Sequence, residues 1–164
     1  VTENRKEDGL VLCRSIMENT VLPSTYMNAK NGILKKRAES EIATEMCRKL
    51  RVKTPSYEKI VNQLSGGNQQ KVIIAKWLMM YPKVLILDEP TRGIDVGAKS
   101  EIYQIMNELT EQGVSIIMIS SDMEEIMGMA DRILVMCEGK ISGELHKGEY
   151  TQEKILEYAA EVKK

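Results

Sequence analysis

The stretch from residue 84 to residue 119 alternates between strand-like and helix-like sequence, and this alternation constrains the fold more than any other feature. Residues 84–87 and 114–119 are continuous apolar runs bounded by turn residues, which is typical of strands buried on both faces of a parallel sheet. Residues 98–111 lie between them, and their apolar side chains recur with a helical period: Ile102, Ile105, Met106 and Leu109. This order predicts an α/β domain with a parallel sheet.

The sequence before this segment favours helices. Residues 1–31 are loop-like, and Pro23 disfavours helix within them. A short helix is predicted over 57–64 and a longer one over 68–80. Residues 33–51 predict an amphipathic helix because apolar residues occur at every fourth position: Leu34, Ala38, Ile42, Met46 and Leu50.

After residue 119 the pattern predicts a short helix over 121–128 capped by Ser121, a third strand over 132–137, an antiparallel strand over 140–145 and a closing helix over 151–162. We therefore expect three parts: an N-terminal remnant over 1–31, a helical subdomain over 32–81 and an α/β portion over 82–164.

Composition argues against several classes of function. The formal net charge of −1 over 164 residues disfavours a general affinity for nucleic acid. No apolar run approaches the roughly 18 residues of a membrane span, and no signal-peptide pattern opens the chain. Cys13, Cys47 and Cys137 are too scattered for a zinc or redox pair, so we expect reduced thiols in a cytosolic protein. The single histidine, His146, is expected to be a surface residue without a role.

The segment Leu-Ser-Gly-Gly-Asn-Gln-Gln-Lys at residues 64–71 carries the strongest chemical signal. Gly66 and Gly67 let backbone amides approach an anion closely, and the following helix directs its N-terminal amides at the same point. Ser65 adds a hydroxyl. The segment predicts a phosphate-binding helix tip; the alternative is a serine helix cap followed by a Gly–Gly turn.

Two acidic residues, Asp88 and Glu89, follow the first apolar run, where α/β sheets bind ligands. In a nucleotide site Asp88 would hold Mg²⁺ through water, and Glu89 would orient or deprotonate the attacking water. The alternative is an acidic pair that caps the strand end. The loop 91–97, with Asp95, is either a shaped functional loop or a turn that starts the next helix.

The order and spacing of these three segments resemble the ATP-binding cassette (ABC) ATPases. Residues 64–71 are similar to the family signature motif, with Asn68 where glutamine is commoner, residues 84–89 resemble the Walker B strand, and residues 94–99 resemble the D-loop, at Asp95. The resemblance implies that Glu89 is catalytic, that Asp88 binds Mg²⁺ through water, and that the signature residues bind an ATP held by another cassette: Ser65, Gly66, Gly67, Asn68 and Gln69.

The implied fold is a truncated P-loop NTPase-like α/β domain with a parallel sheet core and a helical signature subdomain. The Walker A strand, loop and helix are missing, because no G-x-x-x-x-G-K-[ST] string occurs in the 164 residues. We therefore expect exposed sheet edges, and weak or no ATP binding by this chain alone.

A narrower resemblance is carried by residues 64–71, 75–78, 87–103 and 119–136. These segments are similar to the second cassette of fused two-cassette ATPases that import monosaccharides of the ribose, galactose and xylose type. This resemblance implies ATP and Mg²⁺ as cofactors. It implies a second cassette, membrane permease subunits and indirectly a sugar-binding protein as partners, with no nucleic acid. The expected place is the cytoplasmic side of the membrane, bound peripherally.

Two positions depart from the family pattern. Ser121 stands where the family has a histidine that senses the γ-phosphate, and Glu3 stands where it has the glutamine of the Q-loop, which couples to the membrane subunit. We expect the site that uses Asp88 and Glu89 to hydrolyse ATP poorly, and the site that the intact signature motif completes to hydrolyse it well. The alternatives are a nucleoside importer cassette and a non-catalytic module that lends its signature motif to a partner.

Overall fold

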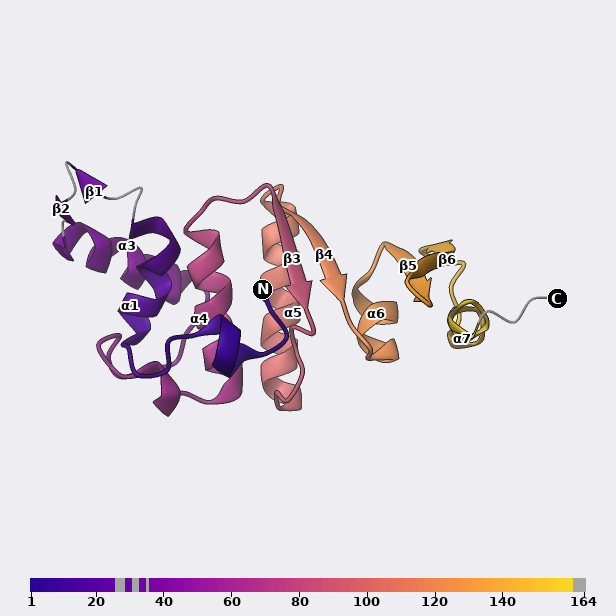
Figure 1. The fold of residues 1–164 in the computed structure, drawn as a ribbon, viewed down its shortest axis with the longest axis horizontal. Helices are drawn as coiled ribbons and strands as arrows, with labels where there is room; N and C mark the ends of the chain where they lie inside the picture. Colours follow the sequence, from indigo (N-terminus) through magenta and orange to yellow (C-terminus); the bar gives the residue numbers. More distant parts are fainter. Residues whose placement is uncertain (26–28, 31–32, 35, 161–164) are drawn as a thin grey trace. The chain divides into compact units, whose positions relative to one another are not determined.

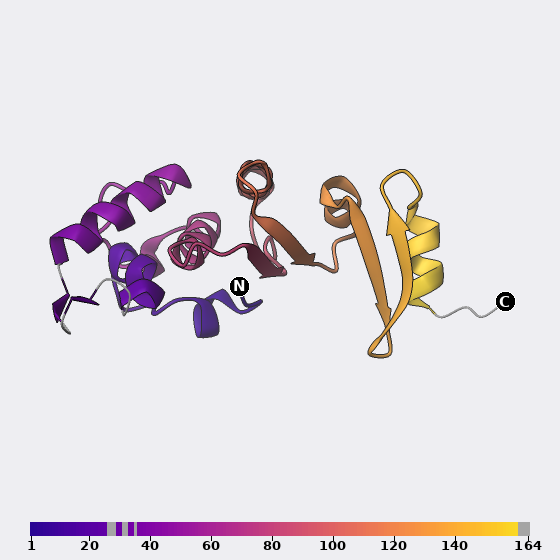
Figure 2. The same ribbon diagram turned by 90° about the horizontal axis from the view of Figure 1, so that it is seen from above.

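The segment that alternates strand and helix folds as a parallel strand pair joined by a helix. In the computed structural model, β3 (Val84–Asp88) runs parallel to β4 (Ser115–Ile119), and Asp88 pairs with Ile119. Helix α5 (Val96–Glu111) connects the two strands and covers one face of the sheet (Figures 1 and 2). The predicted α/β architecture with a parallel sheet is therefore confirmed.

The structure describes residues 1–25, 29–30, 33–34 and 36–160. Within them the chain forms two compact units, residues 1–119 and residues 120–164. The division into three parts that the sequence suggests stays a prediction.

The prediction that both strands are buried on both faces is wrong. Leu85 and Leu87 are buried, because their side chains lie on the face that the helices cover. On the other face four aliphatic side chains are each about half exposed: Val84, Ile86, Ile117 and Ile119. A parallel sheet normally has both faces covered, so this bare apolar face is what a truncated sheet presents.

Helix α4 (Gly66–Leu78) is the centre of the first unit. Val72, Ile73, Ile74 and Ala75 are fully buried, because α4 packs against helices on several sides, as a helix apolar around most of its circumference must. Its neighbours are α1, α3 and α5 (Figure 1). The remaining elements of the unit are η1 (Arg5–Gly9), α1 (Ile16–Val21), η2 (Leu22–Ser24), β1 (Ala29–Lys30), β2 (Ile33–Leu34), α3 (Lys36–Lys49) and η3 (Val61–Gln63).

Several boundaries in this unit differ from the sequence predictions. The N-terminal segment contains α1, which begins at a complete capping box of Ser15 and Glu18, and Pro23 lies inside η2, where a first turn tolerates proline. Helix α3 starts at Lys36 because Leu34 pairs with Ala29 in a short strand. The predicted helix over 57–64 is reduced to η3.

The second unit packs an antiparallel hairpin against a helix. Strand β5 (Arg132–Cys137) pairs with β6 (Lys140–His146) as predicted, in a sheet of their own rather than as part of the parallel sheet. Helices α6 (Met123–Met129) and α7 (Gln152–Ala159) complete the unit. Four buried aliphatic residues form its core: Ile133, Val135, Leu145 and Ile155.

Candidate functional site

Ser65 begins helix α4 and is exposed, Gly66 and Asn68 are half-buried, and Gly67 is buried. The backbone of Ser65 is extended, with φ −62° and ψ 157°, and its carbonyl accepts the amide of Gln69 at 2.9 Å. Its side chain makes no capping bond to the backbone. The amides of Gly66, Gly67 and Asn68 find no acceptor among the described residues, as expected for the first turn of a helix. An anion can therefore take all three amides.

The two glycines bring this tip against the loop that follows β3. A Cβ on Gly67 would lie 2.5 Å from Cβ of Ala98, and a Cβ on Gly66 would lie 3.4 Å from the carbonyl oxygen of Gly93. The tip is therefore not buried away from the acidic strand end, because it rests on the loop that leaves that strand. The close approach to Ala98 explains why position 67 needs glycine, whereas a Cβ at position 66 would make an ordinary van der Waals contact.

Asp88 and Glu89 lie half-buried at the carboxyl end of β3. The amide of Asp88 donates to the carbonyl of Val1 at 3.1 Å, and that of Glu89 donates to the carbonyl of Ile119 at 2.9 Å. Glu89 has φ 45°, a left-handed conformation that is uncommon for a residue with a side chain. It turns the chain sharply, so that both carboxylates stand at the edge where the strands end.

Asp95 caps helix α5, since its Oδ1 accepts the amide of Ala98 at 2.9 Å. The loop is thus a turn that starts the next helix, and its Asp95 side chain is also exposed. Glu3, which is expected to stand at the Q-loop position, forms an ion pair with Arg92 in the loop 91–97. The fold therefore brings four predicted positions together in the first unit. They are the positions that resemble the signature motif, the Walker B end, the D-loop and the Q-loop.

Arg5 joins the same cluster, and the sequence patterns did not point to it. Its guanidinium donates to the carbonyls of Arg92 and Gly93, the latter at 3.4 Å. Burial lowers the pKa of the Arg5 guanidinium, which stays a cation because arginine titrates far above neutrality. No local pattern reveals this contact, because it spans nearly ninety positions of the chain.

A second unforeseen feature is a buried lysine under the tip. The side chain of Lys71 is 1% exposed, and its Nζ lies 2.5 Å from Oε2 of Glu101 and 3.1 Å from the carbonyl oxygen of Arg51. Lys53 also reaches Glu101, at 2.7 Å. Hydrogen bonds from Lys53 and Lys71 lower the pKa of Glu101 to about 2. The sequence signal for the ion pair of Lys71 with Glu101 is a lysine placed one turn after Gly67, on the face of α4 that packs against α5.

Ser121 is not the cap of helix α6, contrary to the prediction. Asp122 caps it, with Oδ1 accepting the amides of Glu124 at 3.1 Å and Glu125 at 3.3 Å. The helix starts one residue later than expected, because Asp122 takes the extended N-cap conformation. Ser121 itself is exposed. His146 is a surface residue 3.6 Å from Glu144.

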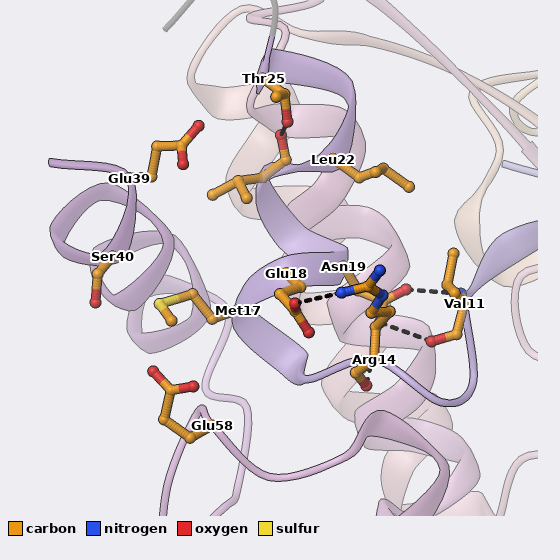
Figure 3. Close-up of a pocket in the computed structure, with 11 residues that line it drawn as sticks. Val11, Arg14, Met17, Glu18, Asn19, Leu22, Thr25, Glu39, Ser40 and Glu58 are labelled. Atoms are coloured by element: carbon orange, nitrogen blue, oxygen red, sulfur yellow. Dashed lines mark hydrogen bonds and ion pairs between the residues drawn. The ribbon is translucent and has the colours of Figure 1, made fainter. Parts of the chain in front are cut away.

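A cavity of about 860 Å³ opens between the segment that follows η1, helix α3 and the loop before η3. Its apolar wall includes Val11, Met17 and Leu22. Its polar wall is mainly acidic: Glu18 is paired with Arg14 at 2.9 Å, whereas Glu58 and Glu39 also line the space (Figure 3). Glu39 is 8% exposed, and its Oε1 has no hydrogen-bond partner in the described part of the chain.

Two kinds of site are not formed by the described residues. No three His, Cys, Asp or Glu side chains gather as a complete metal site, and no helix is long and apolar enough to cross a membrane. Cys13, Cys47 and Cys137 form no disulfide bond in the described part of the chain.

Residues 4–92 match the family model described as ABC transporter. The ribose import ATP-binding proteins RbsA of Oceanobacillus iheyensis and Bacillus subtilis are 58% and 56% identical over 97% of this chain. The chain spans about a third of the length of these relatives, 32% of each.

Among solved structures, the bacterial-type cassette MJ0796, in a dimer with ADP and Pi, superposes with a TM-score of 0.76 at 24% identity. The superposition covers 92% of this chain and 62% of the cassette. At this identity the likeness shows the fold alone.

Proposed function

Because the chain belongs to the ABC transporter family, we propose that it is part of an ATPase that drives import of a monosaccharide. The relatives that match nearly the whole chain are named for ribose import, which supports a sugar rather than a nucleoside as cargo. The complete protein would act at the cytoplasmic face of the membrane, held there by its permease partners.

The exposed Ser65 at the tip of α4 is the observation that carries this proposal. Ser65, Gly66 and Gly67 would contact the terminal phosphates of an ATP whose other contacts come from a second cassette, with Asn68 and Gln69 completing the motif. The free amides at the tip and the exposed hydroxyl of Ser65 support this role. MJ0796, whose fold this chain shares, was solved as a dimer.

The acidic strand end would serve the other nucleotide of the pair. Mg²⁺ in nucleotide sites takes one or two carboxylates together with phosphate oxygens and water, so Asp88 fits that role. Glu89 would act as general base on the attacking water. Asp95 would meet the facing cassette, Ser121 would stand at the γ-phosphate sensor position, and Glu3 would stand at the coupling position.

We propose that the two sites are unequal. Serine has neither the reach nor the titratable nitrogen of histidine, so the site that uses Ser121 would turn over slowly. The site completed by Ser65 would carry most of the hydrolysis.

The acidic cavity would receive a cytoplasmic segment of the permease. Its apolar wall, with Val11, Met17 and Leu22, would pack against apolar side chains of that segment. Glu39 would favour a basic side chain on that segment, because it is buried and its Oε1 has no hydrogen-bond partner among the described residues. The exposed Glu58 adds a second carboxylate to the same cavity.

The test compares two substitutions in the complete two-cassette protein with its permease. Ser65→Arg blocks the α4 tip, and we expect it to abolish ATP turnover and uptake of labelled ribose. Glu89→Gln removes the general base of the weaker site, and we expect it to leave a substantial share of the turnover. If Glu89→Gln stops turnover and Ser65→Arg leaves it unchanged, the proposal is wrong.

A further inference from the structure

The side chain of Asn68 bridges the signature tip to the loop that leads away from α3. Its Oδ1 accepts the backbone amide of Lys53 at 2.8 Å, and its Nδ2 donates to Oγ of Ser65 at 3.0 Å. A backbone amide can only donate, so the bond from Lys53 fixes which end of the Asn68 amide faces Ser65. The NH₂ group must therefore point at the serine.

This bridge decides what the serine hydroxyl can do. Oγ of Ser65 accepts from Asn68 and makes no capping bond to the first-turn amides of its own helix. Ser15, Asp95 and Thr151 do cap their helices in the usual way. At Ser65 the hydroxyl proton and the first-turn amides are all left as donors, which suits an anion.

The segment of Arg51 and Lys53, which bonds to Asn68, is fixed by contacts of its own. Nζ of Lys71 donates to the carbonyl of Arg51 at 3.1 Å, and Nζ of Lys53 lies 2.7 Å from Glu101. Both lysines meet the same carboxylate. The backbone amide of Lys53 thus has little freedom to turn away from Asn68.

We propose that Asn68 is a positioning residue that aims the hydroxyl proton of Ser65 at the terminal phosphate of the facing cassette's ATP, instead of touching that ATP itself. The inference rests on the proposed function, because it assigns how one part of that phosphate-binding tip works. It predicts that Asn68 matters only while Ser65 is present.

A double-mutant cycle in the complete two-cassette protein tests this. We expect Ser65→Ala to lower kcat for ATP about tenfold, and Asn68→Ala to lower it about five- to tenfold. In the Ser65→Ala background, Asn68→Ala should change kcat by less than about twofold, because the group that it positions is gone. Asn68→Gln, which keeps the amide, should recover part of the lost turnover.

Two controls separate positioning from folding. Asn107→Ala changes an exposed asparagine of α5 and should leave kcat unchanged. The midpoint of thermal unfolding should stay the same in Asn68→Ala, because the freed Ser65 hydroxyl can cap α4.

The outcomes distinguish this inference from the proposed function. If Asn68→Ala has no effect, or lowers kcat equally in both backgrounds, the positioning role is overturned while the phosphate-binding tip stands. If Ser65→Ala leaves turnover unchanged, the tip does not bind the facing ATP and the proposed function fails with it.

Discussion

Lys71 is buried inside the first unit and forms an ion pair with Glu101. Removing the Glu101 carboxylate measures how much this ion pair contributes to the free energy of unfolding. Glu101→Gln keeps the shape of the side chain but deletes the negative charge 2.5 Å from Nζ of Lys71. Breaking a buried ion pair from one side typically costs 3–5 kcal/mol. The glutamine oxygen and the carbonyl of Arg51 still accept hydrogen bonds, so we expect a loss of about 2–3 kcal/mol in the free energy of unfolding.

The same helix offers a matched control. Glu108 lies two turns after Glu101 on α5 and pairs with Arg51, but the two side chains are 41% and 49% exposed. Exposed pairs contribute at most about 1 kcal/mol. Glu108→Gln should therefore cost less than about 1 kcal/mol.

The pH dependence of the free energy of unfolding gives a second value for the contribution of Glu101. The pKa of Glu101 falls from 4.5 to about 2 because Lys53 and Lys71 donate hydrogen bonds to it. At 1.36 kcal/mol per pKa unit the shift corresponds to about 3 kcal/mol. Solvent screening reduces this to about 2 kcal/mol, since a third of Glu101 and 70% of Lys53 are exposed. Because the pKa of Glu101 is lower in the folded chain than in the unfolded chain, its carboxylate stabilises the fold fully above pH 4.5. This stabilisation is lost as the pH falls toward 2.

Urea unfolding of the 164-residue chain, followed by the fluorescence of its single tryptophan, Trp77, measures these quantities. The difference between the parent chain and Glu101→Gln should be largest at pH 7 and should shrink toward pH 3. Equal losses for Glu101→Gln and Glu108→Gln, or a difference that does not change with pH, would refute the reasoning.

Two further predictions concern packing. Gly143→Ala would place a Cβ 2.4 Å from Cγ of Tyr158, so we expect the free energy of unfolding to fall by about 1–3 kcal/mol, measured by thermal unfolding followed by circular dichroism. Gly128→Ala is the control: its Cβ would meet nothing within 4 Å, so it should be neutral or slightly stabilising. Ile117→Lys on the bare sheet face should reduce binding of an apolar dye at a cost below about 1 kcal/mol, while Ile105→Lys, in the core, should abolish the cooperative transition.

The sequence predicts those elements whose signal is local. Strands β3 and β4 follow from short apolar runs bounded by turn residues, and helix α5 follows from its hydrophobic period. Their bounds differ from the prediction by at most two residues. The helix predicted over 68–80 is also present, although α4 begins and ends two residues earlier, at Gly66 and Leu78. Each of these signals lies within about fifteen positions, where the chemistry of caps and faces decides the outcome.

The errors arise where distant parts of the chain decide. An apolar run predicts a strand that can be buried on both faces, but whether Ile86 is covered depends on what packs there, and only one face is covered here. Leu34 fits a helical period, yet it pairs with Ala29 in a strand. Ser121 and Asp122 can both cap a helix. Asp122 is the cap of α6, because its backbone takes the extended N-cap conformation.

The contacts between α4 and α5 link the two proposed interface residues mechanically. Gly67 packs on Ala98 at the start of both helices, and one turn further Lys71 binds Glu101. Helices joined at two successive turns cannot slide or rotate past each other without losing a tight apolar contact or a buried ion pair. We therefore expect Ser65, which begins α4, and Asp95, which begins α5, to move together, so that the proposed facing cassette would displace both residues on meeting either one.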